Sequence, residues 1–517
     1  MLKIKTPSRL LLVAIGLGGL ANFLFYDKNP GVSVLLFVAL LLLTLFGLAR
    51  LEKVSLAYRN LWLIVPLLFF ATMIFVRANP TLTLLNGLAV LVLVLLLTFF
   101  YATDHIARLN LLDYPIVLAL TGRQIISQPG PVVFKLGRSA LAHKSYFRLL
   151  LRLGTGLLVA LPVLALFTFL LSSADTIFAK YVNDLFELKV FNNLPDLLWQ
   201  LAVILVVAWF CAGTFYFALG RKTGSEVGNA RTDLPGLLAL HHKLGFVEGA
   251  TALFLVNLLF VFFAWVQFTY LFSDAAASRV NYALYRDYVR RGFGELLIAT
   301  VLTLVLILGM RWMTRHQTKG QAGIFNALST LMIGLALVML VSSFQRMVVW
   351  ENVEYYIHTD TRLYVRAFML WLGLTFGWLA FTLWWRPERF AIGVFVAILG
   401  FVVTVNLMNP DADIAEYNLA RYGKAIDNRG LAVRYLSNLS ADAVPILAAA
   451  LTQDEVSTQV KKGLGCDLYW RLIYIENDRT WREWPSFHLA RAQAYDQLIA
   501  LRKTGQIYQQ LCLKIEP

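Results

Sequence analysis

The sequence contains little charge. Only 15% of its 517 residues are Asp, Glu, Lys or Arg, whereas 59% are hydrophobic and the mean hydropathy is +0.65. A soluble fold could not bury so much apolar surface, so lipid must solvate most of the chain. The alternating ten-residue pattern of a membrane β-barrel is also missing. The remaining interpretation is a helical membrane protein, in which each span pairs its own backbone polar groups.

The sequence also lacks the usual motifs of metal and nucleotide sites. Its seven histidines form no HExxH motif and no zinc-type spacing with cysteine, and no GxxxxGK loop is present. Residues 16–21 match the letters of a dinucleotide fingerprint, but they lie in a hydrophobic run with no strand before it. We interpret these small residues as helix-packing positions. We therefore expect no metal, no cofactor and no ATP-driven transport by this chain alone.

What the sequence does contain is a series of apolar runs long enough to cross a bilayer. The run at 10–25 follows three basic residues but has no small-residue cleavage site, so we interpret it as a span and not as a signal peptide. We predict an all-α, polytopic transmembrane helical bundle over residues 1–408 and a small soluble helical domain at 409–517. The predicted spans, about eleven, are 10–25, 31–48, 61–76, 81–101, 155–172, 197–219, 246–272, 295–310, 325–344, 365–385 and 390–407.

The distribution of basic residues predicts the orientation. Loops on the side of the N-terminus carry 22 Lys and Arg, seven of them in the loop at 102–154, and the opposite ends of the spans carry 11. The first side is therefore predicted to be cytoplasmic. With an odd number of spans, the C-terminal domain is then extracytoplasmic.

The net charge of +15 follows from this topology. Its cations lie at the ends of spans and not in one aromatic-rich patch, so nucleic acid is not an expected partner. The basic end of the loop at 102–154 could lie on anionic headgroups as an interfacial helix. We favour ordinary anchoring by positive residues on the cytoplasmic side.

The C-terminal domain shows helical periodicity and helix-start signals. Thr452 to Glu455 fits a capping box, and Asp442 precedes an Ala-Val-Pro sequence. Cys466 and Cys512 both fall in this domain, where an oxidising compartment would permit a bond between them. Its tryptophans and neighbouring apolar residues exceed what its own core needs, so we expect it to dock on the outer face, close to Asp175, Arg291 and Arg346. The alternative is that these tryptophans fill the core of the domain.

Charged residues gather where several spans meet the predicted outer face. Residues 285–295 run directly into a span and, as one helix, place Tyr288, Arg291 and Glu295 on one face. They could form an anion-binding or gating site, but we favour an Arg291–Glu295 pair that stabilises the helix. Together the predicted outer polar cluster comprises Asp175, Tyr288, Arg290, Arg291, Glu295, Arg346, Glu354, Arg362 and Asp411.

Several of these stretches resemble bacterial membrane proteins known only as domains of unknown function, of the four-one-five-three and four-one-seven-three types. The similar stretches are Ser173–Asp175 with Phe178, Tyr288–Glu295, Arg346–Met347, Thr361–Tyr364, Met408–Asp411, Asp427, Tyr435–Leu436, Leu439–Pro445, Trp481–Trp484 and Ser486. The resemblance implies the architecture above, and the cytoplasmic (inner) membrane of a bacterium as the expected location. It implies no activity.

Two classes of function fit this pattern. The first is a membrane sensor or scaffold acting at the outer face, and the second is a transporter or envelope-lipid-handling protein for an anionic substrate. We favour the first because the sequence contains no convincing internal repeat. A membrane enzyme using Asp175 or Glu295 as a base would need a substrate pocket, and we favour a non-enzyme. The expected partners are the lipid bilayer and, at the outer face, anionic lipid headgroups or a protein.

Overall fold

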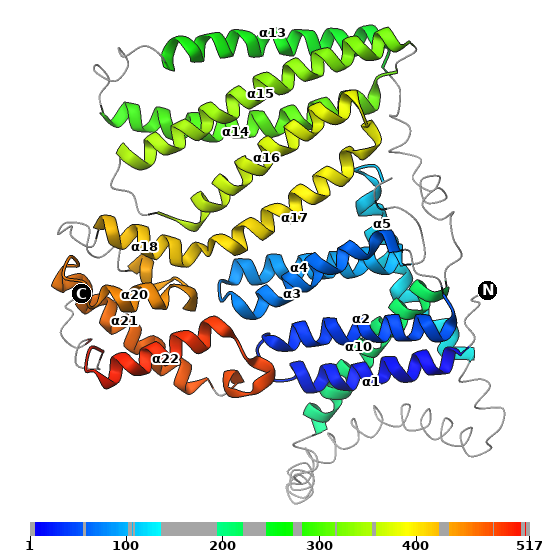
Figure 1. Cartoon of the computed structure of the whole chain (residues 1–517), viewed down its shortest axis with the longest axis vertical. Helices are drawn as coiled ribbons and strands as arrows, with labels where there is room; N and C mark the ends of the chain where they lie inside the picture. The colour runs from blue at the N-terminus through cyan, green and yellow to red at the C-terminus, as the bar shows by residue number, and fades with distance from the viewer. Residues whose placement is uncertain are drawn as a thin grey trace, which may run out of the picture. The chain divides into compact units, whose positions relative to one another are not determined.

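Figure 1 shows the computed structural model of the chain. The structure describes residues 6–54, 58–101, 106, 109–135, 194–220, 244–271, 282–315, 318–353, 358–422, 434–478, 480–507 and 512. Over these residues the chain is helical, and its single β contact is an isolated bridge between Leu244 and Thr314. Nine helices of this part are long and apolar enough to cross a membrane, which confirms the predicted all-α polytopic fold. The predicted span at 155–172 lies outside the described residues.

The chain divides into two compact units, each described here by itself. The first comprises Met1–Leu61, Val94–Asp104 and Leu118–Thr223, and the second comprises Trp62–Leu93, His105–Val117 and Gly224–Pro517. The helices of the membrane part are α1 (Pro7–Phe25), α2 (Val32–Glu52), η1 (Tyr58–Leu63), α3 (Ile64–Val76), α4 (Pro80–Phe100), α5 (Asp113–Ser127), α10 (Leu194–Gly220), α13 (Phe246–Leu271), α14 (Tyr282–Met313), α15 (Lys319–Val353), α16 (Asp360–Trp384), η3 (Pro387–Arg389) and α17 (Phe390–Met408).

In the first unit, α1 packs along α10 through its small residues. A side chain at Gly18 would collide with the Ile204 carbonyl and with Ala208, whereas Gly16 and Gly19 have open space around them. The prediction that this glycine-rich stretch serves helix packing is therefore confirmed at Gly18. The Tyr216 hydroxyl, on α10, adds a hydrogen bond of 2.8 Å to the Pro7 carbonyl.

In the second unit, α13 and α14 pack on α15, α15 packs on α16, and α16 packs on α17. Amide side chains join these helices, because that of Asn257 donates to the Leu328 carbonyl and that of Asn326 donates to the Leu383 carbonyl. Helix α14 begins at Tyr282, more than ten residues before the predicted span at 295–310. The charged stretch ahead of that span continues the helix, since polar residues are compatible with helix outside the hydrocarbon.

The C-terminal residues form short helices around an apolar core. They are α18 (Pro410–Tyr422), η4 (Ala441–Ala443), α20 (Val444–Ala450), α21 (Thr458–Asn477), η5 (Thr480–Arg482), η6 (Trp484–Ser486) and α22 (Leu489–Lys503). Leu447, Leu468 and Leu498 are fully buried in this core, to which α16 adds Leu363. A single residue, Asn409, separates α17 from α18 and adopts a left-handed conformation with φ 51°, which asparagine tolerates better than most residues.

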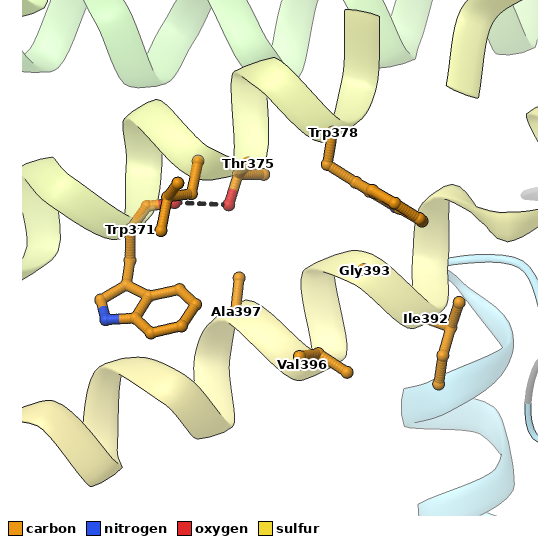
Figure 2. A pocket seen from close by; sticks show the side chains of 8 residues that line it. Trp371, Thr375, Trp378, Ile392, Gly393, Val396 and Ala397 are labelled. Carbon is orange, nitrogen blue, oxygen red and sulfur yellow. Dashed lines mark hydrogen bonds between the residues drawn. The ribbon is translucent and has the colours of Figure 1, made fainter. Parts of the chain in front are cut away.

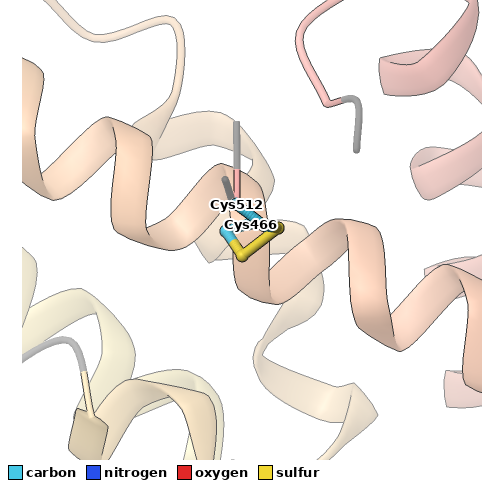
Figure 3. The surroundings of a disulfide bond; sticks show 2 residues. All are labelled: Cys466 and Cys512. Atoms are coloured by element: carbon cyan, nitrogen blue, oxygen red, sulfur yellow. A yellow bond between two sulfur atoms is a disulfide. The ribbon is translucent and has the colours of Figure 1, made fainter. Parts of the chain in front are cut away.

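Among these helices Cys466 is bonded to Cys512, 46 residues away (Figure 3). The capping-box prediction was wrong, because α21 begins at Thr458 and is capped by Ser457, whose hydroxyl accepts from the Val460 N–H. The excess of aromatic surface is present: Trp470, Tyr474 and Trp484 are 53%, 75% and 56% exposed.

We expect Gly18→Val to lower the free energy of unfolding of the protein in detergent by about 2 kcal/mol, because it forces α1 away from α10. Gly19→Val is the matched control, since the same side chain meets open space one residue further along the helix. Thermal unfolding of the two variants beside the wild type measures the difference. Equal destabilisation by both substitutions would contradict the assigned packing.

Candidate functional site

The candidate site is built around the three-residue turn that joins α3 to α4. Pro80 is the first residue of α4, and the residue before a proline avoids helical geometry, so the chain must turn here. The side-chain oxygen of Asn79 accepts a hydrogen bond of 3.1 Å from the Leu82 N–H. Asn79 therefore caps α4 and leaves its own side-chain N–H₂ group available to another partner.

Asp442 binds the backbone of this turn. Its Oδ2 accepts hydrogen bonds from the N–H groups of Ala78 and Asn79, at 2.6 and 3.1 Å. Its Oδ1 lies 3.9 Å from the Arg77 guanidinium. Burial raises the pKa of Asp442, while the Ala78 N–H, Arg77 and the Ser440 hydroxyl oppose that rise. A carboxylate with these partners is well compensated despite a side-chain exposure of only 3%.

Asp411 binds the same turn through a side chain. Its Oδ1 accepts from the Asn79 side-chain amide at 2.9 Å, and its Oδ2 accepts from the Ser440 N–H at 3.0 Å. Asp411 lies in the first turn of α18, where the helix dipole also favours a negative charge. Since the Ser440 hydroxyl donates to Asp442 at 3.1 Å, the two carboxylates and the turn form one buried network.

The network continues into the membrane helices. The Arg77 guanidinium donates from Nε to the Asn406 carbonyl at 2.9 Å. The side chain of Asn406 exchanges two hydrogen bonds with that of Asn86, at 2.9 and 2.8 Å. Both asparagines are fully buried, one on α4 and one on α17. A pair of amides that satisfy each other is a favourable way to hold polar groups between membrane helices.

Arg471 on α21 holds the segment that presents Ser440 and Asp442. Its Nε donates to the Asp467 carboxylate at 2.7 Å. Its two terminal nitrogens donate to four backbone carbonyls, those of Leu436, Ser437, Leu439 and Ser440. Because one planar guanidinium satisfies so many carbonyls, the segment has little freedom to move away from the turn.

His488 closes the network on the side of α22. Its Nε2 lies 3.2 Å from the Arg77 carbonyl. Burial and the nearby charge of Arg491 lower the pKa of His488 from 6.5 to about 4, against the opposing effect of the carbonyls of Arg77 and Ile74. The imidazole is therefore neutral at pH 7, and the Nε2–H tautomer is the one that can donate to the Arg77 carbonyl.

Of the predicted outer polar cluster, Asp411 belongs to this network. Arg346 and Arg362 are half-buried on α15 and α16, and Glu295 is exposed on α14. The Ser343 hydroxyl on α15 donates to the Phe293 carbonyl on α14 at 3.1 Å. The charged stretch at 285–295 therefore lies beside the part of α15 that carries Arg346. The remaining members are Tyr288, Arg290 and Arg291, whose side chains lie outside the described residues, and Asp175 and Glu354, which lie outside them entirely. The shared cluster stays a prediction.

Most of the network was not predicted from the sequence, although two signals pointed to it. Asn79-Pro80 is an Asn-Pro pair at the start of a helix, a typical capping arrangement. Asn86 and Asn406 are isolated polar residues inside apolar runs, where an unpaired amide is costly. These signals indicate that the asparagines have partners, but not which residues the partners are.

The described residues contain no group of three or more His, Cys, Asp or Glu that could hold a metal ion. In the network itself, each oxygen of Asp411 and Asp442 already has a protein donor or an arginine beside it. The arrangement is therefore suited to holding two parts of the chain together.

A family model described as "Domain of unknown function (DUF4153)" matches residues 64–450. The match begins with α3 and ends with α20, so it contains the turn, Asn86, Asn406 and both carboxylates, but not Arg471 or His488. It corresponds to the first of the two family types that the sequence resembles. No curated protein and no solved structure matches the chain.

We expect Asp442→Ala to lower the free energy of unfolding by about 3 kcal/mol, because it removes the acceptor of the Ala78 and Asn79 N–H groups and the carboxylate beside Arg77. Asp454→Ala removes an exposed carboxylate from the connection before α21 and should change stability by less than about 0.5 kcal/mol. Unfolding in detergent, monitored by tryptophan fluorescence, compares the two. A loss at Asp442 no larger than that at Asp454 would show that the network is not a stabilising contact.

A second prediction concerns pH. The folded-state pKa of His488 is depressed, so the stability that it contributes is fully present above pH 6.5 and is lost as the pH falls from 6.5 towards 4. The total loss is about 3 kcal/mol. His488→Gln keeps a donor for the Arg77 carbonyl but cannot titrate, so its stability should fall less steeply over this range. His358, whose pKa is also lowered to about 4, is present in both proteins. Parallel pH profiles would refute the prediction.

Proposed function

The chain belongs to the DUF4153 family, and on that premise we propose that it is a membrane sensor or scaffold acting at the outer face of the cytoplasmic membrane. In this proposal the C-terminal domain receives a ligand or a protein and passes the change to the membrane helices. The observation that carries the proposal is the binding of both Asp411 and Asp442 to the α3–α4 turn.

These contacts support a mechanical coupling because they are few, buried and charged. The domain cannot move away from the turn without leaving two carboxylates unpaired in a poorly solvated position. Asn79 both caps α4 and binds Asp411, so a shift of α18 reaches the first turn of α4. Asn86, two turns further along α4, is bonded to Asn406 on α17, which extends the contact to a second membrane helix.

The orientation in the proposal rests on two observations. The loops on the predicted cytoplasmic side carry 22 Lys and Arg, against 11 at the opposite ends of the spans. The bond between Cys466 and Cys512 is of the kind that persists in an oxidising compartment. Both favour an extracytoplasmic C-terminal domain with the α3–α4 turn on the same side.

A protein partner fits the surface of this domain better than a small molecule. Trp470 and Tyr474 are exposed one helical turn apart on α21, and Trp484 adds a third exposed aromatic ring. Aromatic side chains of this kind supply much of the binding energy of protein interfaces. The domain would then serve as the receiving surface of a sensor or the docking platform of a scaffold.

The alternative function is transport or lipid handling for an anionic substrate. Many secondary transporters bind their substrate where membrane helices break near the middle of the bilayer. Helices α13 to α17 each run without interruption over their described length. These continuous helices, together with a polar network that joins the C-terminal domain to the membrane region, favour the sensor or scaffold.

The coupling can be tested without knowing the ligand, by loosening the domain through reduction of the Cys466–Cys512 bond. In lipid nanodiscs we expect reduction to raise hydrogen exchange both in the domain and at the first-turn amides of α4, Leu82 and Thr83. The change at α4 should be about fivefold or more, the lower end of typical coupling between sites.

Asp411→Ala should abolish the response of α4 while the domain itself still loosens on reduction. Glu416→Ala, an exposed carboxylate on the same helix, is the matched control and should respond as the wild type does. If reduction leaves α4 unchanged in the wild type, or if Asp411→Ala responds as fully as Glu416→Ala, the proposed coupling is wrong.

A further inference from the structure

Helices α16 and α17 are joined by two tryptophan–glycine contacts. A side chain at Gly400 would overlap the ring of Trp371, and a side chain at Gly393 would overlap the ring of Trp378. The two tryptophans are seven residues apart on α16, and the two glycines are seven residues apart on the antiparallel α17. Each indole therefore crosses from one helix to the other at a position where only glycine leaves room for it.

Both indole rings are fixed by hydrogen bonds. The ring N–H of Trp371 donates to the Thr404 hydroxyl at 3.0 Å, and that of Trp378 donates to the Arg389 carbonyl at 3.1 Å. A tryptophan whose N–H is paired and whose ring lies against glycine has little freedom to rotate. The space between the two rings is consequently kept open by rigid walls.

That space is an apolar groove of about 370 Å³ (Figure 2). Its lining residues are Trp371, Leu374, Thr375, Trp378, Ile392, Gly393, Val396 and Ala397. The one hydroxyl among them, on Thr375, donates to the Trp371 carbonyl of its own helix. Leu374 and Val396 on the rim are 53% and 46% exposed, so the groove opens towards the bilayer. It offers water almost no partners, and a hydrocarbon chain is the occupant that its surface fits.

One end of the groove reaches a basic segment. The carbonyl that holds Trp378 belongs to Arg389, and the side chains of Arg386 and Arg389 are both exposed. Trp384 and Trp385, 49% and 69% exposed, lie immediately before them. Exposed tryptophans next to arginines at the end of a membrane helix are typical of the headgroup level of a bilayer.

The charge of this segment favours an anion. Glu388, the one acidic residue between Trp384 and Phe390, lines a separate cavity of about 130 Å³ together with Arg311. The start of α17 adds the partial positive charge of a helix N-terminus. The apolar groove therefore lies next to the basic segment, as the acyl chain of a phospholipid lies next to its phosphate.

We propose that the groove between α16 and α17 is a binding site for an anionic phospholipid. One acyl chain lies between Trp371 and Trp378, and the headgroup phosphate is bound by Arg386 and Arg389. The site belongs to the leaflet at the α16–α17 connection, which is the predicted cytoplasmic side, and it does not depend on the sensor proposal.

The test is native mass spectrometry of the full chain in micelles that contain equal amounts of phosphatidylglycerol and phosphatidylcholine with identical acyl chains. The wild type should retain phosphatidylglycerol in clear preference, by roughly fivefold for each arginine. Arg386→Gln with Arg389→Gln should bring the ratio close to one. Arg315→Gln, an exposed arginine at the corresponding end of α14, should leave the ratio unchanged.

The acyl chain is tested by filling the groove. Ala397→Phe places a ring in the lining and should remove the retained lipid of both headgroup types. Ile398→Phe adds the same ring at a neighbouring position that is 57% exposed outside the lining and should retain the lipid. If Ala397→Phe does not yield folded protein, the arginine variants decide the proposal.

Two results would overturn the assignment. One is a wild-type protein that retains the two lipids in equal amounts. The other is a folded Ala397→Phe protein that keeps its preferred phosphatidylglycerol, because the lipid would then be bound somewhere other than the groove.

Discussion

The burial of two carboxylates against one turn is the constraint on which the second unit depends. A carboxylate away from water must have each oxygen satisfied, and Asp411 and Asp442 meet that demand with the backbone of Ala78 and Asn79, an amide side chain, Ser440 and Arg77. The requirement places α18 and η4 beside the α3–α4 turn. Arg471 donates to four carbonyls of the adjoining segment and so keeps Ser440 and Asp442 in place beside the turn.

The helical fold could be predicted from the sequence because the bilayer leaves the backbone few alternatives. An apolar run of sufficient length must form a helix, whatever its neighbours are, so most span positions needed no tertiary information. Where polar residues precede a span this reasoning stops, and α14 accordingly begins well before its predicted start. In the C-terminal domain, local patterns were less reliable, since Ser457 and not Thr452 caps α21.

The site could be predicted only in part, because its bonds join residues that are far apart in the chain. Asp411 was identified by its place after a span, and Asp442 was noted only as a helix-start signal. Their common partner, Asn79, lies 332 positions from Asp411 and 363 from Asp442. No local pattern encodes such a pairing. The isolated asparagines at 86 and 406 indicated that partners exist, yet they did not indicate which ones.

The tryptophan–glycine contacts between α16 and α17 also restrict how these helices can move. If α17 slid by one turn, both indoles would meet residues that carry a Cβ, and both contacts would be lost together. Sliding of packed helices is a common way for membrane and soluble proteins to change shape, but here the register has two fixed points seven residues apart. Helices α16 and α17 should therefore tilt or rotate as a single rigid lever, with the Asn86–Asn406 pair as its pivot between α17 and α4.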